Sequence, residues 1–177
     1  MSIVDFHNHL IPGVDDGAQT LADSEAGVAA FIADGVGGFD DRGAEPTHHP
    51  SYLNARLIEI DEGWAQLVQL CAVKFPDLAI YRAVELLLDV PEPDLSDRRL
   101  RINGGDFVLV EFPFMTVPPH SSHVIRRISN GSCIPVLAHP ERYRGLTSVD
   151  MAAEWKDAGA LLQVRPGFAD GAVAIVC

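Results

Sequence analysis

Basic residues are scarce in this chain: 13 lysines and arginines stand against 25 aspartates and glutamates in 177 residues, a formal net charge of −12. No basic stripe interleaved with aromatic side chains occurs, so nucleic acid is not an expected partner. Acidic side chains of this kind are ordinarily solvated. We therefore interpret the negative charge as a general property of the surface rather than as a functional patch.

Long apolar runs are also missing. No uninterrupted apolar stretch approaches about 18 residues, and no charged-then-apolar signal region opens the chain, so we expect neither a membrane span nor an export signal. The expected location is the cytoplasm. A chain of 177 residues is of a size for one domain with a real core, and we predict a single domain over residues 1–177.

Cysteine is rare as well, with only Cys71, Cys133 and Cys177. Their odd number and scattered positions predict reduced thiols rather than a disulfide framework. None has an arginine at the sixth position after it, because Cys71 leads to Asp77 and Cys133 leads to His139. The C-x5-R loop of phosphatases with a cysteine nucleophile is therefore absent, and buried or neutral cysteine is the better interpretation.

Strand-like and helix-like segments alternate along the chain, which predicts a parallel sheet or an α/β barrel. The stretch 35–43 is an exception, because it carries four glycines and two aspartates where an apolar second strand is due, and we expect that strand to be frayed or missing. The other predicted strands cover 3–6, 78–86, 106–112, 133–139 and 161–164, and the predicted helices cover 20–35, 54–73, 120–129 and 148–159.

Thr20 with Asp23 three residues later resembles a capping box at the start of the first helix, and Val28, Phe31 and Ile32 form its apolar stripe. The buried face predicted for the second helix consists of Leu57, Ile60, Trp64, Leu67 and Cys71.

A candidate metal site begins in residues 5–17. His7 and His9 alternate at the end of the first predicted strand, so their side chains point the same way while Asn8 faces away. The turns that follow contain Pro12-Gly13 and Asp16-Gly17, and they bend the chain back so that Asp15 or Asp16 returns to the two histidines. Histidine combined with carboxylate suits zinc, manganese, iron or a mixed polynuclear centre better than calcium or magnesium.

Three further candidates lie at strand ends. Glu85 comes late in the third strand, Glu111 late in the fourth and His139 at the end of the fifth. In an α/β barrel the carboxyl ends of the strands carry the catalytic groups, so these side chains would converge there. Taken singly, each has a plain alternative: a carboxylate in water at the rim, or a histidine that only ends a strand before Pro140.

Four segments carry a resemblance to a known family: Asp5-Phe-His-Asn-His9, Asp15-Asp16-Gly17, Val110-Glu111-Phe112-Pro113-Phe114 and Pro135-Val-Leu-Ala-His-Pro-Glu-Arg-Tyr143. They resemble motifs of the PHP-superfamily bacterial protein-tyrosine phosphatases of the CpsB/YwqE type. The resemblance runs from residue 2 to about residue 165 and implies a distorted (β/α)7 barrel with a polynuclear centre containing Mn²⁺, Fe and Zn being alternatives. It also implies hydrolysis of phosphotyrosine on the tail of a bacterial tyrosine kinase of capsule or exopolysaccharide synthesis.

The resemblance also assigns roles to single residues. Arg142 matches an arginine that holds the phosphate, for which its planar fork is suited, although a surface ion pair with Glu141 is the plain alternative. Clustered metals would bind the phosphate and acidify a water, which is what hydrolysis of a phosphomonoester requires. The residues that match metal ligands are His7, His9, Asp16, Glu85, Glu111 and His139.

Two departures from the family pattern matter. The family has Thr-Pro-His-His at a strand end, whereas the order here is Glu45-Pro46-Thr47-His48-His49, so the register is open and His48 is carried over as a further ligand. The family closes its site with an Asp-x-His on a late strand, and nothing after Gln163 supplies it. The expectation is a barrel incomplete at its C-terminal end with two ligands fewer, which a homo-oligomer would be one way to complete.

Three functions follow from these patterns. The first is a metal-dependent tyrosine phosphatase that uses metal-activated water. The second is another PHP phosphoesterase, acting on histidinol phosphate or a nucleotide. The third is a catalytically impaired metal-binding remnant or regulatory binder, which the missing Asp-x-His favours. The Asp15-Asp16-Gly17 loop and the run from His139 to Arg142 favour the first over the second.

Overall fold

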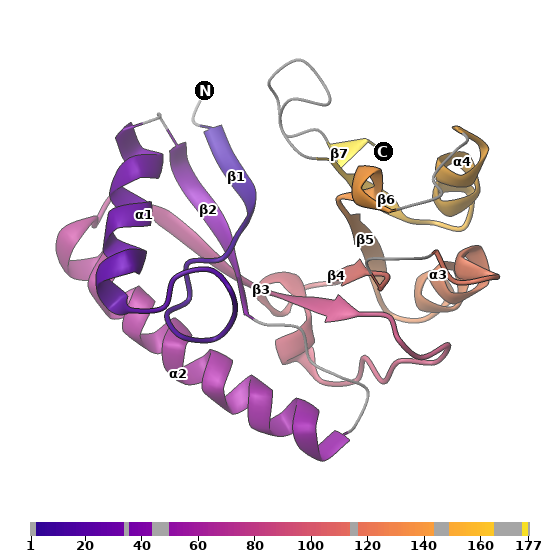
Figure 1. The fold of residues 1–177 in the computed structure, drawn as a ribbon, viewed down its shortest axis with the longest axis horizontal. Coiled ribbons are helices and arrows are strands. Elements are labelled where there is room, and N and C mark those ends of the chain that lie inside the picture. Colours follow the sequence, from indigo (N-terminus) through magenta and orange to yellow (C-terminus); the bar gives the residue numbers. More distant parts are fainter. Residues whose placement is uncertain are drawn as a thin grey trace. The chain divides into compact units, whose positions relative to one another are not determined.

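The computed structural model describes residues 3–33, 36–43, 50–113, 117–143, 149–164 and 175–176. Strands and helices alternate along it (Figure 1), and every strand pair is parallel except the last one that is described. The predicted α/β class with a parallel sheet is therefore confirmed. The chain divides into two compact units, Met1–Val84 and Glu85–Cys177. The single domain over 1–177 stays a prediction.

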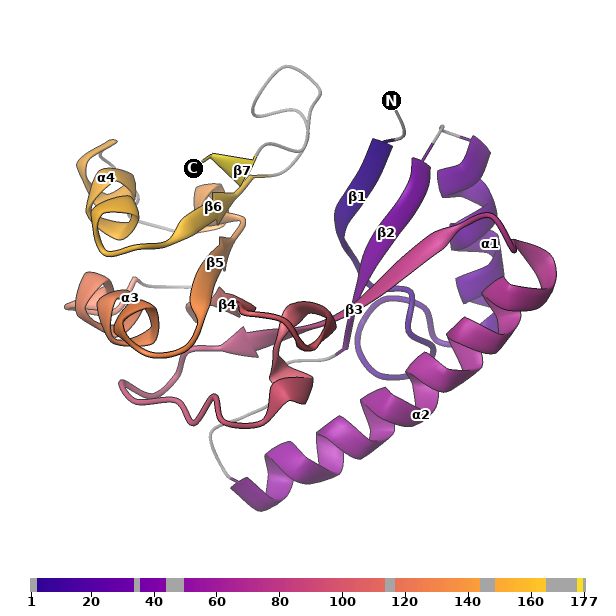
Figure 2. The same ribbon diagram turned by 180° about the vertical axis from the view of Figure 1, so that it is seen from behind.

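The first unit is a parallel β-α-β-α-β arrangement. Strand β1 pairs with β2, and β2 pairs with the first part of β3. Helix α1 packs against β2 and against α2, as Figure 2 shows from behind. Its elements are β1 (Ile3–Asn8), α1 (Leu21–Ala33), β2 (Val36–Gly43), α2 (Pro50–Lys74) and β3 (Ala79–Leu87), the last of which continues into the second unit.

Strand β2 corrects the expectation of a frayed or missing second strand. It runs over Val36–Gly43 despite its glycines and aspartates. Its backbone pairs on both sides: Val36 lies opposite Ile3 of β1, and Gly43 lies opposite Val84 of β3. Two flanking strands supply hydrogen bonds that do not depend on the side chain, so the ladder compensates for the low strand propensity of this segment.

The predicted capping box of α1 is confirmed. The Thr20 hydroxyl accepts a hydrogen bond from the Asp23 backbone N–H at 3.2 Å, and the Asp23 carboxylate accepts one from the Thr20 N–H at 2.9 Å. Both otherwise unpaired donors at the helix start are thereby satisfied. The predicted apolar stripe is narrower than expected, because Val28 is buried whereas Ile32 is 41% exposed.

Helix α2 starts at Pro50, four residues before the predicted start at Asn54. Proline fits the first turn of a helix, because its missing N–H would have no partner there anyway. The predicted buried face is confirmed at Leu57, Ile60, Leu67 and Cys71, while Trp64 is only half-buried.

The second unit has its own series of paired strands. The end of β3 pairs with β4, β4 with β5 and β5 with β6, all parallel, and β7 pairs antiparallel with β6. Strand β7 was not expected from the sequence, whereas the others lie within a few residues of their predicted bounds. The elements are η1 (Arg98–Leu100), η2 (Ile102–Gly104), β4 (Phe107–Glu111), α3 (Ser121–Asn130), β5 (Ile134–Ala138), η3 (Pro140–Arg142), α4 (Val149–Asp157), β6 (Leu161–Gln163) and β7 (Ile175–Val176).

An aromatic cluster forms the core of the second unit. Trp155 and Phe112 are fully buried, and their ring centroids lie 5.9 Å apart. The indole N–H of Trp155 donates to the Ser121 hydroxyl at 2.9 Å, which ties α4 to the first residue of α3. Burial of the indole therefore leaves its one polar atom satisfied.

The cysteines agree with the sequence analysis where they are described. Cys71 and Cys133 are buried and form no disulfide, as predicted, while Cys177 lies outside the described residues. Among the helices in the described part of the chain, none combines the length and apolar character needed to cross a membrane.

Candidate metal centre

The first candidate cluster lies at the end of β1. His7 is in the strand and His9 follows its last residue, and their ring centroids are 5.3 Å apart. Asn8 between them is buried, whereas both histidines are partly exposed. The strand alternation that predicted two imidazoles on one side is therefore confirmed.

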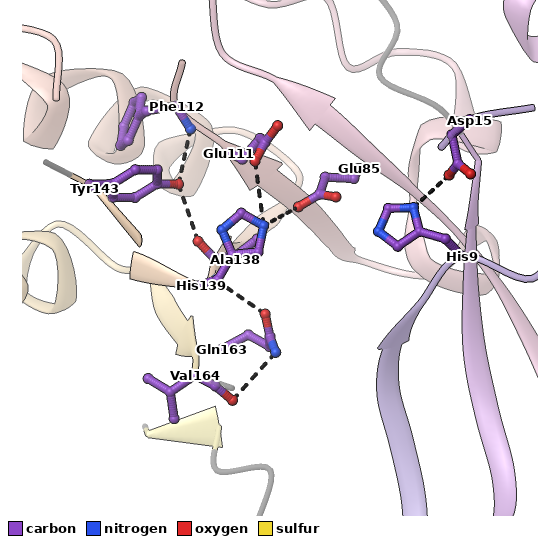
Figure 3. Close-up of polar contacts among 10 residues, drawn as sticks. All are labelled: His9, Asp15, Glu85, Glu111, Phe112, Ala138, His139, Tyr143, Gln163 and Val164. Atoms are coloured by element: carbon purple, nitrogen blue, oxygen red, sulfur yellow. Dashed lines mark hydrogen bonds and ion pairs between the residues drawn. The ribbon is translucent and has the colours of Figure 1, made fainter. Parts of the chain in front are cut away.

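The loop after β1 folds back onto His9. The Asp15 carboxylate lies 2.5 Å from His9 Nδ1 (Figure 3). It also accepts a hydrogen bond from the Gly17 N–H at 2.7 Å. The Ala18 N–H donates to the His9 carbonyl at 2.9 Å, which closes the loop. A Cβ at Gly17 would lie 2.1 Å from the His9 carbonyl oxygen, so only glycine allows this close approach.

Both candidate carboxylates return to His9. His9, Asp15 and Asp16 each offer a donor atom, and these atoms all lie within 4.8 Å of one another. Asp16 is exposed and Asp15 partly buried. Sequence spacing allowed either aspartate, and the resemblance favours Asp16. In the structure Asp15 contacts the His9 imidazole and orients it, while Asp16 lies in the same group of three donor residues.

The second candidate cluster belongs to the second unit. His139 Nε2 lies 3.0 Å from Glu85 Oε1 and 3.4 Å from Glu111 Oε2 (Figure 3). The three residues are 2%, 3% and 1% exposed respectively. Glu111 is the last residue of β4 and His139 follows the last residue of β5, while Glu85 lies near the end of β3. The predicted convergence of these strand ends is therefore confirmed.

The second cluster offers donor atoms that suit a cation. One imidazole nitrogen can donate to only one of the two carboxylates at a time. Two carboxylates and one imidazole thus lie together as buried side chains. Buried carboxylates are usually hydrogen-bonded, paired with a cation or bound to a metal ion. Nitrogen and oxygen donors together suit manganese, iron or zinc, so these residues fit a metal ion.

The backbone at His139 is held in an unusual conformation. Its φ of 30° lies in the left-handed region, which costs roughly 1 kcal/mol or more for a residue other than glycine. Its N–H donates to the Gln163 side chain at 3.2 Å, and its carbonyl accepts from the Arg142 N–H at 2.9 Å. Gln163 on β6 and the turn η3 therefore fix the direction in which the imidazole leaves β5.

Tyr143 joins the ends of β4 and β5. Its hydroxyl accepts a hydrogen bond from the Phe112 N–H at 3.0 Å and donates one to the Ala138 carbonyl at 3.1 Å (Figure 3). Burial raises the pKa of this hydroxyl far above its usual range, and the Glu111 and Glu85 carboxylates raise it further, against the lowering effect of the Phe112 hydrogen bond. The hydroxyl therefore stays protonated and keeps donating. It holds the residue after Glu111 beside the residue before His139.

The remaining predicted residues have different outcomes. Arg142 is the last residue of η3 and is exposed. His48 lies outside the described residues. Sequence reasoning missed the positioning roles of Gln163 and Tyr143. Each residue gave one signal in the sequence. Tyr143 is the last residue of the segment from Pro135 that carried the resemblance, and Gln163 is a polar residue at the end of an apolar strand.

Comparison with known families gives one match over most of the chain. The family described as capsular polysaccharide synthesis, CpsB/CapC, matches residues 3–172.

Individual relatives agree with that match. The tyrosine-protein phosphatase YwqE of Bacillus subtilis is 29% identical over 182 residues, covering 96% of this chain and 66% of YwqE. CapC of Staphylococcus aureus is 27% identical over 169 residues, covering 92% of this chain and 64% of CapC. The chain therefore spans slightly less than two thirds of the length of these relatives.

A solved structure is also similar. It comes from work on YwqE from Bacillus subtilis and CpsB from Streptococcus pneumoniae, described there as metal-dependent tyrosine phosphatases. The TM-score is 0.78 at 28% identity, and the match covers 93% of this chain and 67% of the other. The mixed α/β architecture with a parallel sheet is thus the architecture of that structure.

Tyr143→Phe should lower the free energy of unfolding by about 1–3 kcal/mol, because the buried N–H of Phe112 loses its acceptor while the ring packing remains. Urea titration followed by circular dichroism measures the change. Tyr81→Phe is the matched control, since Tyr81 is 42% exposed and should change stability by less than about 0.5 kcal/mol. Equal effects of the two substitutions would contradict the role assigned to the Tyr143 hydroxyl.

Proposed function

This chain belongs to the CpsB/CapC family of capsular polysaccharide synthesis proteins, and we propose that it is a metal-dependent phosphatase that hydrolyses phosphotyrosine on proteins. The observation that carries the proposal is the buried arrangement of two carboxylates around one nitrogen of His139. That arrangement suits a cation, and the relative YwqE is named a tyrosine-protein phosphatase.

We propose that both clusters bind metal ions. The proposed ligands are His7, His9, Asp16, Glu85, Glu111 and His139. Mn²⁺ is the proposed metal, with iron and zinc as alternatives that the same donor types suit. In the first cluster the contact between Asp15 and His9 Nδ1 sets the orientation of that imidazole, as carboxylates beside metal-bound histidines commonly do. His48 stays a prediction from the sequence.

Hydrolysis needs positive charge on the phosphoryl oxygens and a nucleophile at neutral pH. When bound, metal ions supply both, because they bind phosphate and lower the pKa of a water. Arg142 would add a planar pair of N–H donors to two phosphate oxygens, for which its exposed position leaves room. Gln163 and Tyr143 keep the protein groups in place, so that little reorganisation is needed during the reaction.

We also propose a particular substrate and barrel type. The proposed substrate is phosphotyrosine on a bacterial tyrosine kinase of capsule or exopolysaccharide synthesis. The proposed fold is a distorted (β/α)7 barrel of the PHP type. A homo-oligomer stays a prediction from the sequence.

Removal and return of metal test the proposal directly. Purified protein should contain metal by elemental analysis, should lose phosphate release from a phosphotyrosine peptide after dialysis against a chelator, and should regain it with Mn²⁺. Turnover of histidinol phosphate or a nucleotide but not of the peptide would instead favour another phosphoesterase. Stoichiometric metal without turnover of any phosphate ester would favour a binding protein.

His139→Ala and Glu111→Gln should each lower the metal content and reduce metal-dependent phosphate release at least about tenfold, because water does not replace either ligand with the same geometry. Elemental analysis and a phosphate-release assay measure the two effects. Glu62→Gln is the control, since Glu62 is an exposed residue of α2. Undiminished activity in either ligand variant would refute its assignment.

Arg142→Ala should raise KM for a phosphotyrosine peptide about tenfold while the metal content stays the same, because it removes a charged donor to the phosphate but no ligand. Arg142→Lys should recover only part of the loss, since lysine keeps the charge but not the planar pair of donors. Metal loss in Arg142→Ala would mean that the arginine has a structural role instead.

A further inference from the structure

A groove of about 500 Å³ runs along one side of α3 in the second unit. Two arginines and two histidines line it, Arg126, Arg127, His120 and His123, together with apolar surface from residues such as Pro91. No carboxylate side chain among the described residues lines it. In a chain with a net charge of −12, this α3 groove stands out as a site that favours anions.

The groups in the α3 groove are available to a ligand. His120 and His123 lie one helical turn apart, and their rings stack with centroids 5.3 Å apart and an angle of 8° between their planes. Both histidines and Arg126 are exposed. Within the described part of the chain, none of these three side chains forms a hydrogen bond or an ion pair. Their N–H groups are therefore not committed to holding the fold together.

Arg127 is the exception, because it forms an ion pair with Glu92. Both side chains are largely exposed, at 60% and 69%, so the pair contributes little to stability. Glu92 lines an adjoining groove of about 600 Å³, which Arg127 also lines. The Glu92 carboxylate is thus already bound to Arg127 at the boundary of the α3 groove. An incoming carboxylate would compete with it.

We propose that the α3 groove binds an acidic segment of the protein substrate. Guanidinium groups pair with carboxylates, neutral or protonated imidazoles donate N–H groups to them, and Pro91 and Val124 offer apolar contact to the side-chain stems. A short acidic peptide fits better than a nucleic acid. A long polyanion would also meet the acidic remainder of the surface, which opposes its binding.

The position of the α3 groove suits recognition of residues that flank the phosphotyrosine. Pro91 lies on the segment that follows β3, and His120 lies on the segment that follows β4, which ends at Glu111. Both segments follow a strand that carries a carboxylate of the second cluster near its end, Glu85 in β3 and Glu111 in β4. The identity of the peptide as a phosphatase substrate rests on the proposed function, whereas its binding to the groove does not.

Binding is measured without turnover, by fluorescence anisotropy of a labelled, unphosphorylated glutamate-rich peptide added to the full chain. A peptide with glutamine at each glutamate should bind about tenfold more weakly, and added NaCl should weaken binding of the acidic peptide because exposed charges are screened. Arg126→Ala should weaken it about threefold and Arg126→Glu about tenfold.

Two further variants separate an effect of charge in the α3 groove from a general effect of substitution. Glu92→Gln should tighten binding of the acidic peptide by about twofold to threefold, because it releases Arg127 and removes a competing carboxylate. Lys156→Ala on α4 removes the same charge as Arg126→Ala but outside the α3 groove, so it should leave the affinity unchanged. A purely structural effect of the substitutions would not tighten binding in one variant and weaken it in another.

Turnover gives a second measurement. The ratio of kcat/KM for a phosphotyrosine peptide with acidic flanks to that for p-nitrophenyl phosphate should fall in Arg126→Glu and stay constant in Lys156→Ala. Equal binding of the acidic and glutamine peptides, equal losses in Arg126→Ala and Lys156→Ala, or tighter binding of a single-stranded oligonucleotide would overturn the groove assignment. Failure to hydrolyse either substrate would count against the phosphatase proposal alone, since the anisotropy measurements decide the groove.

Discussion

The confinement of two carboxylates against one imidazole nitrogen is the constraint on which the second unit depends. Glu85 and Glu111 come from different strands, and both lie within 3.4 Å of His139 Nε2 while almost fully buried. Two carboxylates this close repel each other when both are ionised, so a positive ion beside them would be favourable. The parallel register of β3 with β4 and of β4 with β5 brings these chain segments together.

Hydrogen bonds between uncharged groups hold the backbone on either side of this cluster in place. Tyr143 ties the backbone beside Glu111 to the backbone beside His139, and Gln163 holds the strained turn at His139 from the next strand. In the first unit, the Asp15 carboxylate and the close approach at Gly17 do the same for His9. Donor atoms held in advance lose little entropy when a ligand binds, which is what a metal site or a phosphate site requires. Arg126 and the two histidines of the α3 groove differ in this respect, since a recognition surface needs groups that are not already engaged.

Much of this arrangement could be predicted from the sequence, and the failures have identifiable causes. The alternation of His7 and His9 and the capping box at Thr20 are local patterns, so spacing alone predicted both. Strand β2 was misjudged, because its residues have low strand propensity and its stability comes from pairing with strands on both sides. The positioning roles of Gln163 and Tyr143 were missed, because their contacts reach 24 and 31 positions along the chain. No local pattern reports contacts of that range.

The sequence by itself determined the donor types, their placement at strand ends and the class of fold, because these follow from residue chemistry and from short-range periodicity. Only the tertiary structure decided which donors meet. It brought Glu85 to His139 across 54 positions, selected Asp15 as the partner of His9 Nδ1, and left Arg126 uncommitted beside two stacked histidines. The physical reason is that strand register and loop closure, which set these distances, depend on the packing of the whole unit rather than on any one segment.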